Sequence, residues 1–342
     1  MRRGAALLLA LLLTAVLCSC SQRQATTLEL FAMDTYMTVN ADGGTAEETA
    51  QAVAREINRL EGVLSRTIAS SSVSRLNAEG SVQPDEDTAA LLAAALTYSG
   101  ETGGAFDITI APLVALWGIT SDTPRVPAQE EIDALLPLVG SEHVHLDGGN
   151  AVLDAGCAID LGGIAKGYAS DKAAAILTGS DVTRACANLG GNVYVLSREG
   201  SEAWNVAIQD PQAQSDYVCI LSLTDHFVVT SGGYQRYFTA PDGTVYQHIL
   251  DPETGYPAQS DLLSVSIILP RDGAALSGTR ADAYSTALYV MGERGATAFW
   301  QARQDFDMVL VTADGRVVYT PGLSDYFHEA EGSGYDYQLL SA

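Results

Sequence analysis

The sequence predicts a single α+β domain over residues 28–342, in which helices are mixed with antiparallel strands. Three observations support this class. Apolar residues make up 47% of the 342 residues and charged residues 18%, which allows a large buried core. Segments with helical and strand periodicity alternate without a regular strand–helix–strand rhythm. No repeat, low-complexity block or clean linker divides the chain.

The N-terminus is expected to be a targeting segment outside this domain. A basic start followed by apolar residues 5–17 indicates a secretory signal peptide over residues 1–19. The run LCSC resembles a bacterial lipobox with Cys20 as the lipidated residue, and residues 20–27 then supply the lipidated cysteine and a polar tether. This predicts an extracytoplasmic protein, lipid-anchored to the bacterial cell membrane. Ordinary signal cleavage and a retained membrane anchor are the alternatives.

Helices are expected where apolar residues recur three and four positions apart. Thr45 and Glu48 resemble a capping box that starts the first of them. A proline-containing exposed loop over 120–131 leads into a short helix. Apart from that short helix, the expected helices cover residues 50–64, which follow the capping box, and 85–102, 164–177, 282–291 and 295–304.

Strands are expected to dominate from residue 184 onward. Before that point, 28–40 has the partial alternation of one strand, and 144–161 predicts a hairpin that turns at Gly148-Gly149. A closing hairpin is expected around Asp314-Gly315. The remaining expected strands and the arms of that hairpin are 192–197, 204–209, 218–223, 227–231, 263–269, 308–312 and 316–319.

The charge and the cysteines exclude several classes of protein. A net charge of −24 repels phosphates, so electrostatic nucleic-acid binding and a polybasic membrane patch are excluded. Only two of the 18 basic residues are lysines, Lys166 and Lys172. Cys157, Cys186 and Cys219 lack C-x-x-C spacing, which argues against a zinc site. They are interpreted as buried thiols, with one disulfide and one spare cysteine as the alternative.

Four turns carry paired glycines, and such pairs let a ligand approach the backbone. The second of them opens a helix, so its free N–H groups are suited to a phosphate, and Lys166 lies one turn further on. Each pair alone is also compatible with an ordinary turn. The pairs are Gly103-Gly104, Gly162-Gly163, Gly190-Gly191 and Gly232-Gly233.

Two further segments carry polar groups that suit catalysis. His248 lies between a strand and a turn, where it is either a general base or a hydrogen-bonded structural histidine. Asp282 and Thr286 are four residues apart, on one face of a helix. A carboxylate and a hydroxyl so placed suit Mg²⁺, although both could serve the helix alone. Together these features predict Mg²⁺-dependent phosphoryl chemistry on a nucleotide.

Six motifs, in this order along residues 30–323, resemble those of the ApbE-type flavin transferases, the FAD:protein FMN transferases. They are GGAFD (103–107), DLGGIAKGYA (160–169), NLGGN (188–192), SGGYQRYF (231–238), HILDPETG (248–255) and ADAYSTAL (281–288).

The resemblance implies one α+β domain around an FAD cleft. It also implies Mg²⁺-dependent transfer of FMN from FAD to a threonine of an acceptor protein, with release of AMP. The implied acceptors are exported redox proteins such as subunits of Rnf/Nqr-type complexes. Two alternatives stay open: an extracytoplasmic FAD pyrophosphatase that yields FMN and AMP, and a flavin-binding lipoprotein without catalysis.

The resemblance also implies roles for single residues. Asp34 stands where the family's M-G-T motif has glycine, and Thr67 stands where many transferases place a flavin-stacking tyrosine. His248 is the implied catalytic base. The implied FAD contacts are Met33, Ala105, Phe106, Asp107, Asp160, Lys166 and Ile249. The implied metal ligands are Gly163 through its carbonyl, Asp282, Ser285 and Thr286.

Overall fold

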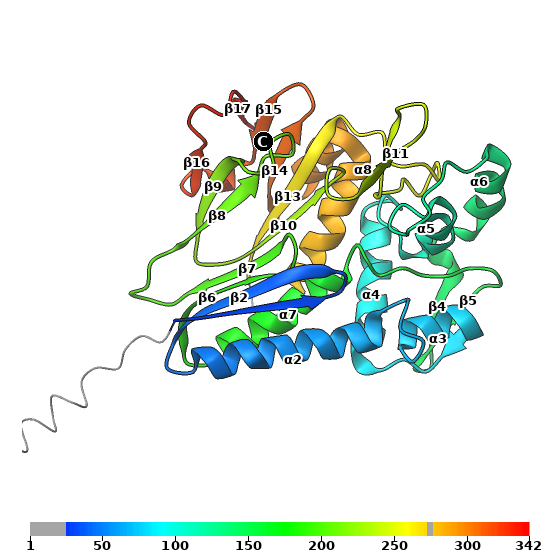
Figure 1. Cartoon of the computed structure of the whole chain (residues 1–342), viewed down its shortest axis with the longest axis horizontal. Helices are drawn as coiled ribbons and strands as arrows, with labels where there is room; N and C mark the ends of the chain where they lie inside the picture. Colours follow the sequence, from blue (N-terminus) through cyan, green and yellow to red (C-terminus); the bar gives the residue numbers. More distant parts are fainter. Residues whose placement is uncertain (1–24, 272–275, 342) are drawn as a thin grey trace, which may run out of the picture.

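A nine-stranded sheet forms the centre of the computed structural model, which describes residues 25–271 and 276–341 (Figure 1). All neighbouring strands are antiparallel except the last pair, β15 and β17. In sheet order the strands are β1 (Ala25–Ala32), β2 (Thr35–Gly43), β6 (Val182–Asn188), β7 (Asn192–Ser197), β10 (Asp225–Gly232), β13 (Leu262–Pro270), β14 (Asp307–Thr312), β15 (Arg316–Tyr319) and β17 (Asp336–Leu339).

Helices pack on one face of this sheet and a smaller sheet packs on the other (Figure 1). One hydrophobic core lies on each face, and the side chains of the central strands alternate between the two. In β10, Phe227 joins the helical side and Val228 the other side, and in β13 Ile267 and Ile268 divide in the same way. The helices are α2 (Ala46–Leu64), α4 (Glu86–Glu101), α7 (Ala165–Thr178) and α8 (Ser277–Arg303), and the small sheet has the order β16 (Phe327–Glu329), β9 (Tyr217–Leu223), β8 (Trp204–Gln209).

Most of the shorter elements gather beside α4, to its right in Figure 1. A third core there packs Trp117, Ile132 and Leu250 together. The elements are α3 (Ser72–Glu79), β3 (Ser81–Val82), η1 (Ile108–Ile110), α5 (Ala111–Trp117), α6 (Gln129–Leu135), η2 (Leu136–Leu138), η3 (Ser141–His143), β4 (Val144–Asp147), β5 (Asn150–Leu153), β11 (Tyr237–Thr239) and β12 (Val245–Gln247), with η4 (Pro321–Leu323) at the other end.

The predicted α+β class and most predicted elements are confirmed. The single strand over 28–40 is wrong, because β1 and β2 form a hairpin that turns at Met33 and Asp34 with φ of 49° and 58°. Aspartate adopts left-handed backbone more often than most residues but methionine does not, so the sequence carries only a weak signal for this turn. The expected capping box is also wrong, since the Thr45 side chain caps no helix N–H group.

Other boundaries differ in smaller ways. The hairpin over 144–161 turns at Gly148-Gly149 as predicted, but its second strand ends at Leu153. The helices 282–291 and 295–304 are two parts of α8, interrupted at Gly292, and the first part begins at Ser277. β1 begins at Ala25, so the last three residues of the expected tether belong to the sheet.

The signal peptide, Cys20 and residues 20–24 lie outside the described residues. Within the described part of the chain, no helix is both long and apolar enough to cross a membrane. Cys157, Cys186 and Cys219 are free thiols, which rules out the alternative of a disulfide among them.

Helices α7 and α8 touch at two glycines. A Cβ atom at Gly167 would lie 2.3 Å from the Gly278 carbonyl oxygen, and one at Gly278 would lie 2.7 Å from the Gly167 carbonyl oxygen. Atoms at such distances overlap, so neither position accepts a side chain without moving the helices apart. The paired glycines therefore fix the distance between α7 and α8.

This contact predicts a loss of stability in Gly278→Ala. The added methyl group overpacks the crossing and should lower the free energy of unfolding by roughly 1–3 kcal/mol. Gly100→Ala is the matched control, because a Cβ there meets no atom within 4 Å in helix α4. Urea unfolding followed by circular dichroism compares the two. Equal stability of both variants would contradict the tight crossing.

Candidate active site

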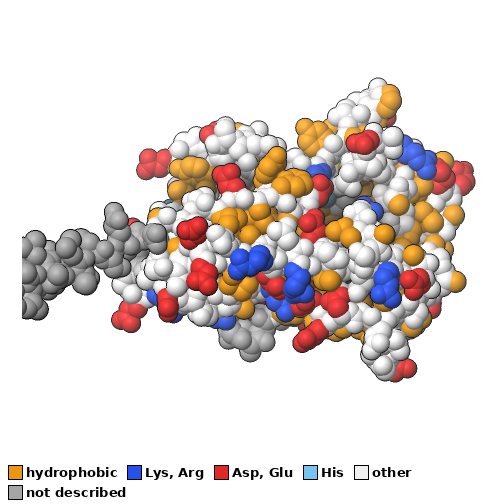
Figure 2. Space-filling view, turned by 60° about the horizontal axis from the view of Figure 1, so that its bottom comes forward, with side chains coloured by type: hydrophobic (Ala, Val, Ile, Leu, Met, Phe, Trp, Pro, Cys, Tyr) orange, Lys and Arg blue, Asp and Glu red, His pale blue; other side chains and the backbone are white. Residues whose placement is uncertain are grey.

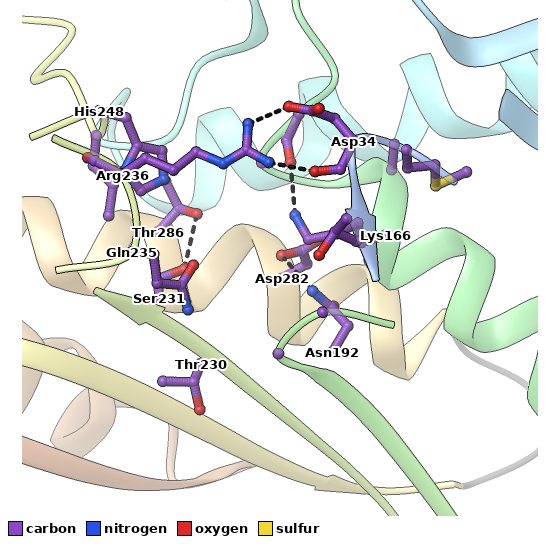
Figure 3. Close-up of a pocket in the computed structure, with 18 of the residues that line it drawn as sticks. Asp34, Lys166, Asn192, Thr230, Ser231, Gln235, Arg236, His248, Asp282 and Thr286 are labelled. Atoms are coloured by element: carbon purple, nitrogen blue, oxygen red, sulfur yellow. Dashed lines mark hydrogen bonds and ion pairs between the residues drawn. The ribbon is translucent and has the colours of Figure 1, made fainter. Parts of the chain in front are cut away.

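A cavity of about 1160 Å³ opens between the end of the sheet and the helices (Figure 3). Its volume slightly exceeds the usual range of ligand pockets, about 300–1000 Å³, so it has room for a large ligand. The turn between β1 and β2, the entrance to α7, the ends of β7 and β10, and α8 all contribute to its wall. Figure 2 shows a hollow in the surface with basic and acidic side chains along its edge. The cavity therefore joins segments that are far apart in the sequence.

The loop before α7 and the first turn of the helix supply hydrogen-bond acceptors and one cation without an ion-pair partner in the described part of the chain. Gly162 N–H donates to Asp160 Oδ1 at 2.8 Å, and the other carboxylate oxygen forms an ion pair with Arg66 at 2.8 Å. Lys166 Nζ contacts only the Gly162 carbonyl, at 3.3 Å, and forms no ion pair among the described residues. An ammonium group beside a helix N-terminus can bind the phosphates of a ligand.

Asp282 is a buried carboxylate of the cavity, with 3% of its surface exposed. Gly167 N–H donates to Asp282 Oδ2 at 2.8 Å, and Asn192 Nδ2 donates to Oδ1 at 3.4 Å. The first bond spans 115 residues and depends on the close crossing of α7 and α8. Asp282 is thus held from two sides with its carboxylate at the cavity wall (Figure 3).

Hydroxyl groups continue the polar wall next to Asp282. Ser231 Oγ lies 2.8 Å from Ser285 Oγ and 3.3 Å from Thr286 Oγ1. Ser285 also donates to the Asp282 carbonyl at 2.9 Å, and it is fully buried behind the cavity wall. Ser231 and Thr286 line the cavity, whereas Ser285 does not. Ser285 therefore connects α8 to β10 through hydrogen bonds behind the cavity wall.

The donor set of this wall fits Mg²⁺. Asn192 Oδ1 is buried beside Asp282 without a hydrogen-bond partner, which leaves an unsatisfied oxygen where a cation would bind. A Cβ at Gly163 would lie 3.5 Å from Thr286 Oγ1, so the predicted ligands are neighbours. The described residues contain no cluster of three His, Cys, Asp or Glu suited to a metal. Such a site would combine the one carboxylate of Asp282 with neutral oxygens and phosphates, as Mg²⁺ sites commonly do.

His248 lines the cavity in a defined tautomer. Its backbone N–H donates to the Arg236 carbonyl at 3.0 Å, and its ring Nδ1 lies 3.2 Å from the same oxygen. A carbonyl oxygen only accepts, so Nδ1 carries the proton and Nε2 is free to take one. Burial, then the charge of Lys166 and the nearby Arg236, lowers the pKa of His248 from 6.5 to about 4. The ring is therefore a neutral base at pH 7.

An ion pair crosses the mouth of the cavity. The Arg236 guanidinium donates to Asp34 Oδ2 and to the Asp34 carbonyl, both at 2.5 Å (Figure 3). Asp34 is 73% exposed and belongs to the turn between β1 and β2. The pair thus connects that turn to the loop whose carbonyl orients His248.

The cavity brings together most of the residues predicted from the sequence. Ala105 and Ser285 do not line it, and Cys20 lies outside the described residues. Asp107 lines it, but its carboxylate accepts from Thr109 N–H at 2.8 Å and so caps η1. The predicted residues on the wall are Met33, Phe106, Asp107, Asp160, Gly163, Lys166, His248, Ile249, Asp282 and Thr286, with Asp34 and Thr67 beside them.

Sequence reasoning missed three polar residues of the wall. Asn192 ends the NLGGN motif, whose glycines predict the turn but not the role of the amide. Arg236 lies within SGGYQRYF, which gives no role to the arginine. Arg66 directly precedes Thr67 and has no motif of its own. The scarcity of cations in this acidic chain is the one signal that could have indicated the two arginines.

Comparison with known proteins gives one consistent family. The family model described as "ApbE family" matches residues 33–310. An FAD:protein FMN transferase of Treponema pallidum is 34% identical over 79% of this chain and 78% of its own length. An FAD:protein FMN transferase of Escherichia coli K12 is 29% identical over 85% of each chain.

Solved structures agree with these sequence matches. The ApbE protein of Thermotoga maritima superposes with a TM-score of 0.81 at 33% identity, covering 90% of this chain and 100% of that one. The apo flavinyl transferase ApbE of Pseudomonas stutzeri gives a TM-score of 0.78 at 28% identity, covering 91% of this chain and 99% of that one.

The environment of His248 predicts a measurable titration. Its ring signals in carbon-13 histidine NMR should titrate near pH 4, and Lys166→Gln should move the midpoint up toward 6.5 because a repelling charge is removed. Lys172→Gln, which changes the only other lysine, should leave the midpoint in place. His248→Gln assigns the signal.

The lowered pKa of His248 also predicts how the stability of the folded protein depends on pH. The unfolded chain takes up the His248 proton near pH 6.5, before the folded protein does, so this residue lowers stability as pH falls from 6.5 to about 4. A midpoint near 6.5 in the native protein, unchanged by Lys166→Gln, would contradict the burial and charge effects described here.

Proposed function

The chain belongs to the ApbE family, and we propose on that basis that it transfers FMN from FAD to a threonine hydroxyl of an acceptor protein and releases AMP. One observation carries this proposal. A single cavity holds a neutral, oriented histidine together with an oxygen cluster around Asp282 and an unpaired Lys166. Displacement at a pyrophosphate needs a base for the acceptor, a cation for the phosphates and a fixed geometry.

The proposed reaction exchanges the phosphoanhydride bond between the two halves of FAD for a phosphoester bond to the acceptor. The acceptor oxygen forms a bond to the FMN phosphorus, and the bond from that phosphorus to the bridging oxygen breaks. AMP leaves with the bridging oxygen and its electron pair. The proton of the acceptor hydroxyl passes to Nε2 of His248, which the Arg236 carbonyl keeps free for it.

The remaining polar groups bind and orient the substrate. Lys166 and the N–H groups at the entrance to α7 are placed to contact the diphosphate. Asp282 and Thr286, with the Gly163 carbonyl and Asn192 beside them, would hold Mg²⁺. When bound, Mg²⁺ neutralises negative charge on the phosphate oxygens. A chain with a net charge of −24 needs such local cations to hold a diphosphate.

The acceptors and the location form part of the proposal. The lipobox-like sequence at Cys20 supports a lipid-anchored, extracytoplasmic enzyme that modifies exported redox proteins, such as Rnf/Nqr-type subunits. Ala25, the first residue of β1, lies at the opposite end of the hairpin from the Met33–Asp34 turn at the cavity. An anchor before Ala25 would therefore leave the cavity end of the hairpin directed toward a partner.

FAD hydrolysis is the second candidate, with water in place of the acceptor hydroxyl. Thr67 favours it, because a small side chain lines the wall where a ring would cover the flavin. Asp282, Thr286 and His248 together argue against pure binding, since binding alone needs no base.

The test is an assay of transfer and of AMP release in one tube. The chain from Ser21 onward is mixed with FAD, Mg²⁺ and a purified domain of an Rnf-type subunit that carries an acceptor threonine. His248→Ala should slow flavin labelling by about 10²–10⁴-fold, the usual worth of a general base, while FAD binding persists.

Flavin fluorescence of the acceptor on a denaturing gel and AMP in solution report the two products. AMP without labelling, also in the absence of the acceptor, would favour hydrolysis. Normal labelling by His248→Ala would show that the base lies elsewhere.

The metal ligands predict a second result. Thr286→Val removes a hydroxyl ligand and should raise the Mg²⁺ concentration needed for half-maximal AMP release by about tenfold, whereas Thr286→Ser retains the ligand. Asp282→Asn should abolish Mg²⁺-dependent turnover, because the charge is lost while an acceptor for Gly167 N–H remains. Unchanged Mg²⁺ dependence in Thr286→Val and Asp282→Asn would disprove the assigned ligands.

A further inference from the structure

A second, smaller groove of about 340 Å³ opens beside the cavity. One wall is the exposed segment from Ile119 to Asp122 after α5, and the other runs from Gln235 to Tyr237 before β11. Thr120, Gln235 and Arg236 line both hollows. The groove is therefore continuous with the cavity at its mouth.

We propose that this groove, 119–122 with 235–237, binds an extended segment of the acceptor protein and leads its hydroxyl to His248. The inference rests on the proposed transfer and adds the surface on which the acceptor lies. FAD alone needs only the cavity, whereas transfer also requires a path for a polypeptide. The groove supplies that path because it ends at the residue that contacts the base.

Arg236 is that residue. Its carbonyl oxygen binds the backbone N–H and Nδ1 of His248, and its side chain reaches Asp34 at the cavity mouth. A segment lying along the groove passes Arg236 before it meets the histidine. Arg236 therefore lies between the groove that would hold the acceptor segment and the histidine that would take the proton of its hydroxyl.

The chemistry of the walls suits a polypeptide. Thr120, Ser121, Asp122 and Gln235 offer hydrogen-bonding groups, and Tyr237 adds a ring that is 55% exposed. Exposed tyrosines of this kind dominate many protein interfaces. Asp122 suits a basic residue of the segment. Lipid would need an apolar face, and nucleic acid would meet the chain's negative charge.

Backbone pairing supports an extended occupant. Among the described residues β11 pairs only with β12, which leaves the other edge of Tyr237–Thr239 without a strand. Such an edge can bind an extended peptide through main-chain hydrogen bonds. Figure 1 shows this hairpin projecting beside α5 and α6, where a partner can approach it.

The experiment blocks the groove without touching the cavity. Asp122→Trp fills it and Tyr237→Ala removes its ring, and neither residue lines the cavity. Tyr217→Ala is the matched control, because Tyr217 is 44% exposed on β9 and outside the groove. The same Rnf-type acceptor domain is titrated with each variant, and FAD affinity is measured by flavin fluorescence.

The KM for the acceptor domain should rise about tenfold or more in both groove variants. FAD affinity should stay within about twofold, and Tyr217→Ala should behave as wild type. A wild-type KM in both groove variants would overturn the groove as the docking site, and so would a parallel loss of FAD affinity. If the wild-type enzyme labels no acceptor at all, the proposed transfer itself fails, which is a different result.

Discussion

The hydrogen bond from Gly167 N–H to Asp282 Oδ2 exists because α7 and α8 cross where neither helix has a side chain. Any Cβ at Gly167 or Gly278 would overlap backbone atoms of the other helix. The same crossing places the start of α7, the candidate phosphate site, beside the oxygens of α8. Gly167 and Asp282 are 115 residues apart in the sequence and meet at this one contact. The distance between the two helices therefore sets the distance between the candidate metal ligands on α8 and the candidate phosphate site at the start of α7.

The charge of the cavity wall differs from that of the molecule. The described residues that line the cavity include three cations, and two of them are neutralised locally, Arg66 by Asp160 and Arg236 by Asp34. Lys166 remains without a carboxylate partner among the described residues. In a chain of net charge −24, this single free ammonium is the group that we propose binds the diphosphate. Burial and, after it, the charge of Lys166 lower the pKa of His248, so the residue proposed to bind phosphate also helps to keep the base neutral.

The sequence could predict what depends on local pattern. Helical spacing located α2, α4 and α7, and the four-residue spacing of Asp282 and Thr286 placed both on one helix. It could not predict the left-handed turn at Met33 and Asp34, because aspartate favours that backbone only weakly and methionine does not favour it. Nor could it predict the pairs Arg66–Asp160 and Arg236–Asp34, or the amide of Asn192 beside Asp282, since these contacts join distant segments. Motifs indicated the loops, and only the fold showed which side chains meet.

Arg236 connects the base to the surface. Exposed ion pairs contribute about 0–1 kcal/mol, so a partner can displace Asp34 from Arg236 at little cost. The carbonyl of Arg236 remains bound to His248 through two hydrogen bonds whichever way its side chain turns. On the proposed docking path, an arriving segment can therefore open the mouth of the cavity by moving a side chain while the backbone keeps Nε2 free. Access for the acceptor and orientation of the base are separated within one residue, the first in its side chain and the second in its main chain.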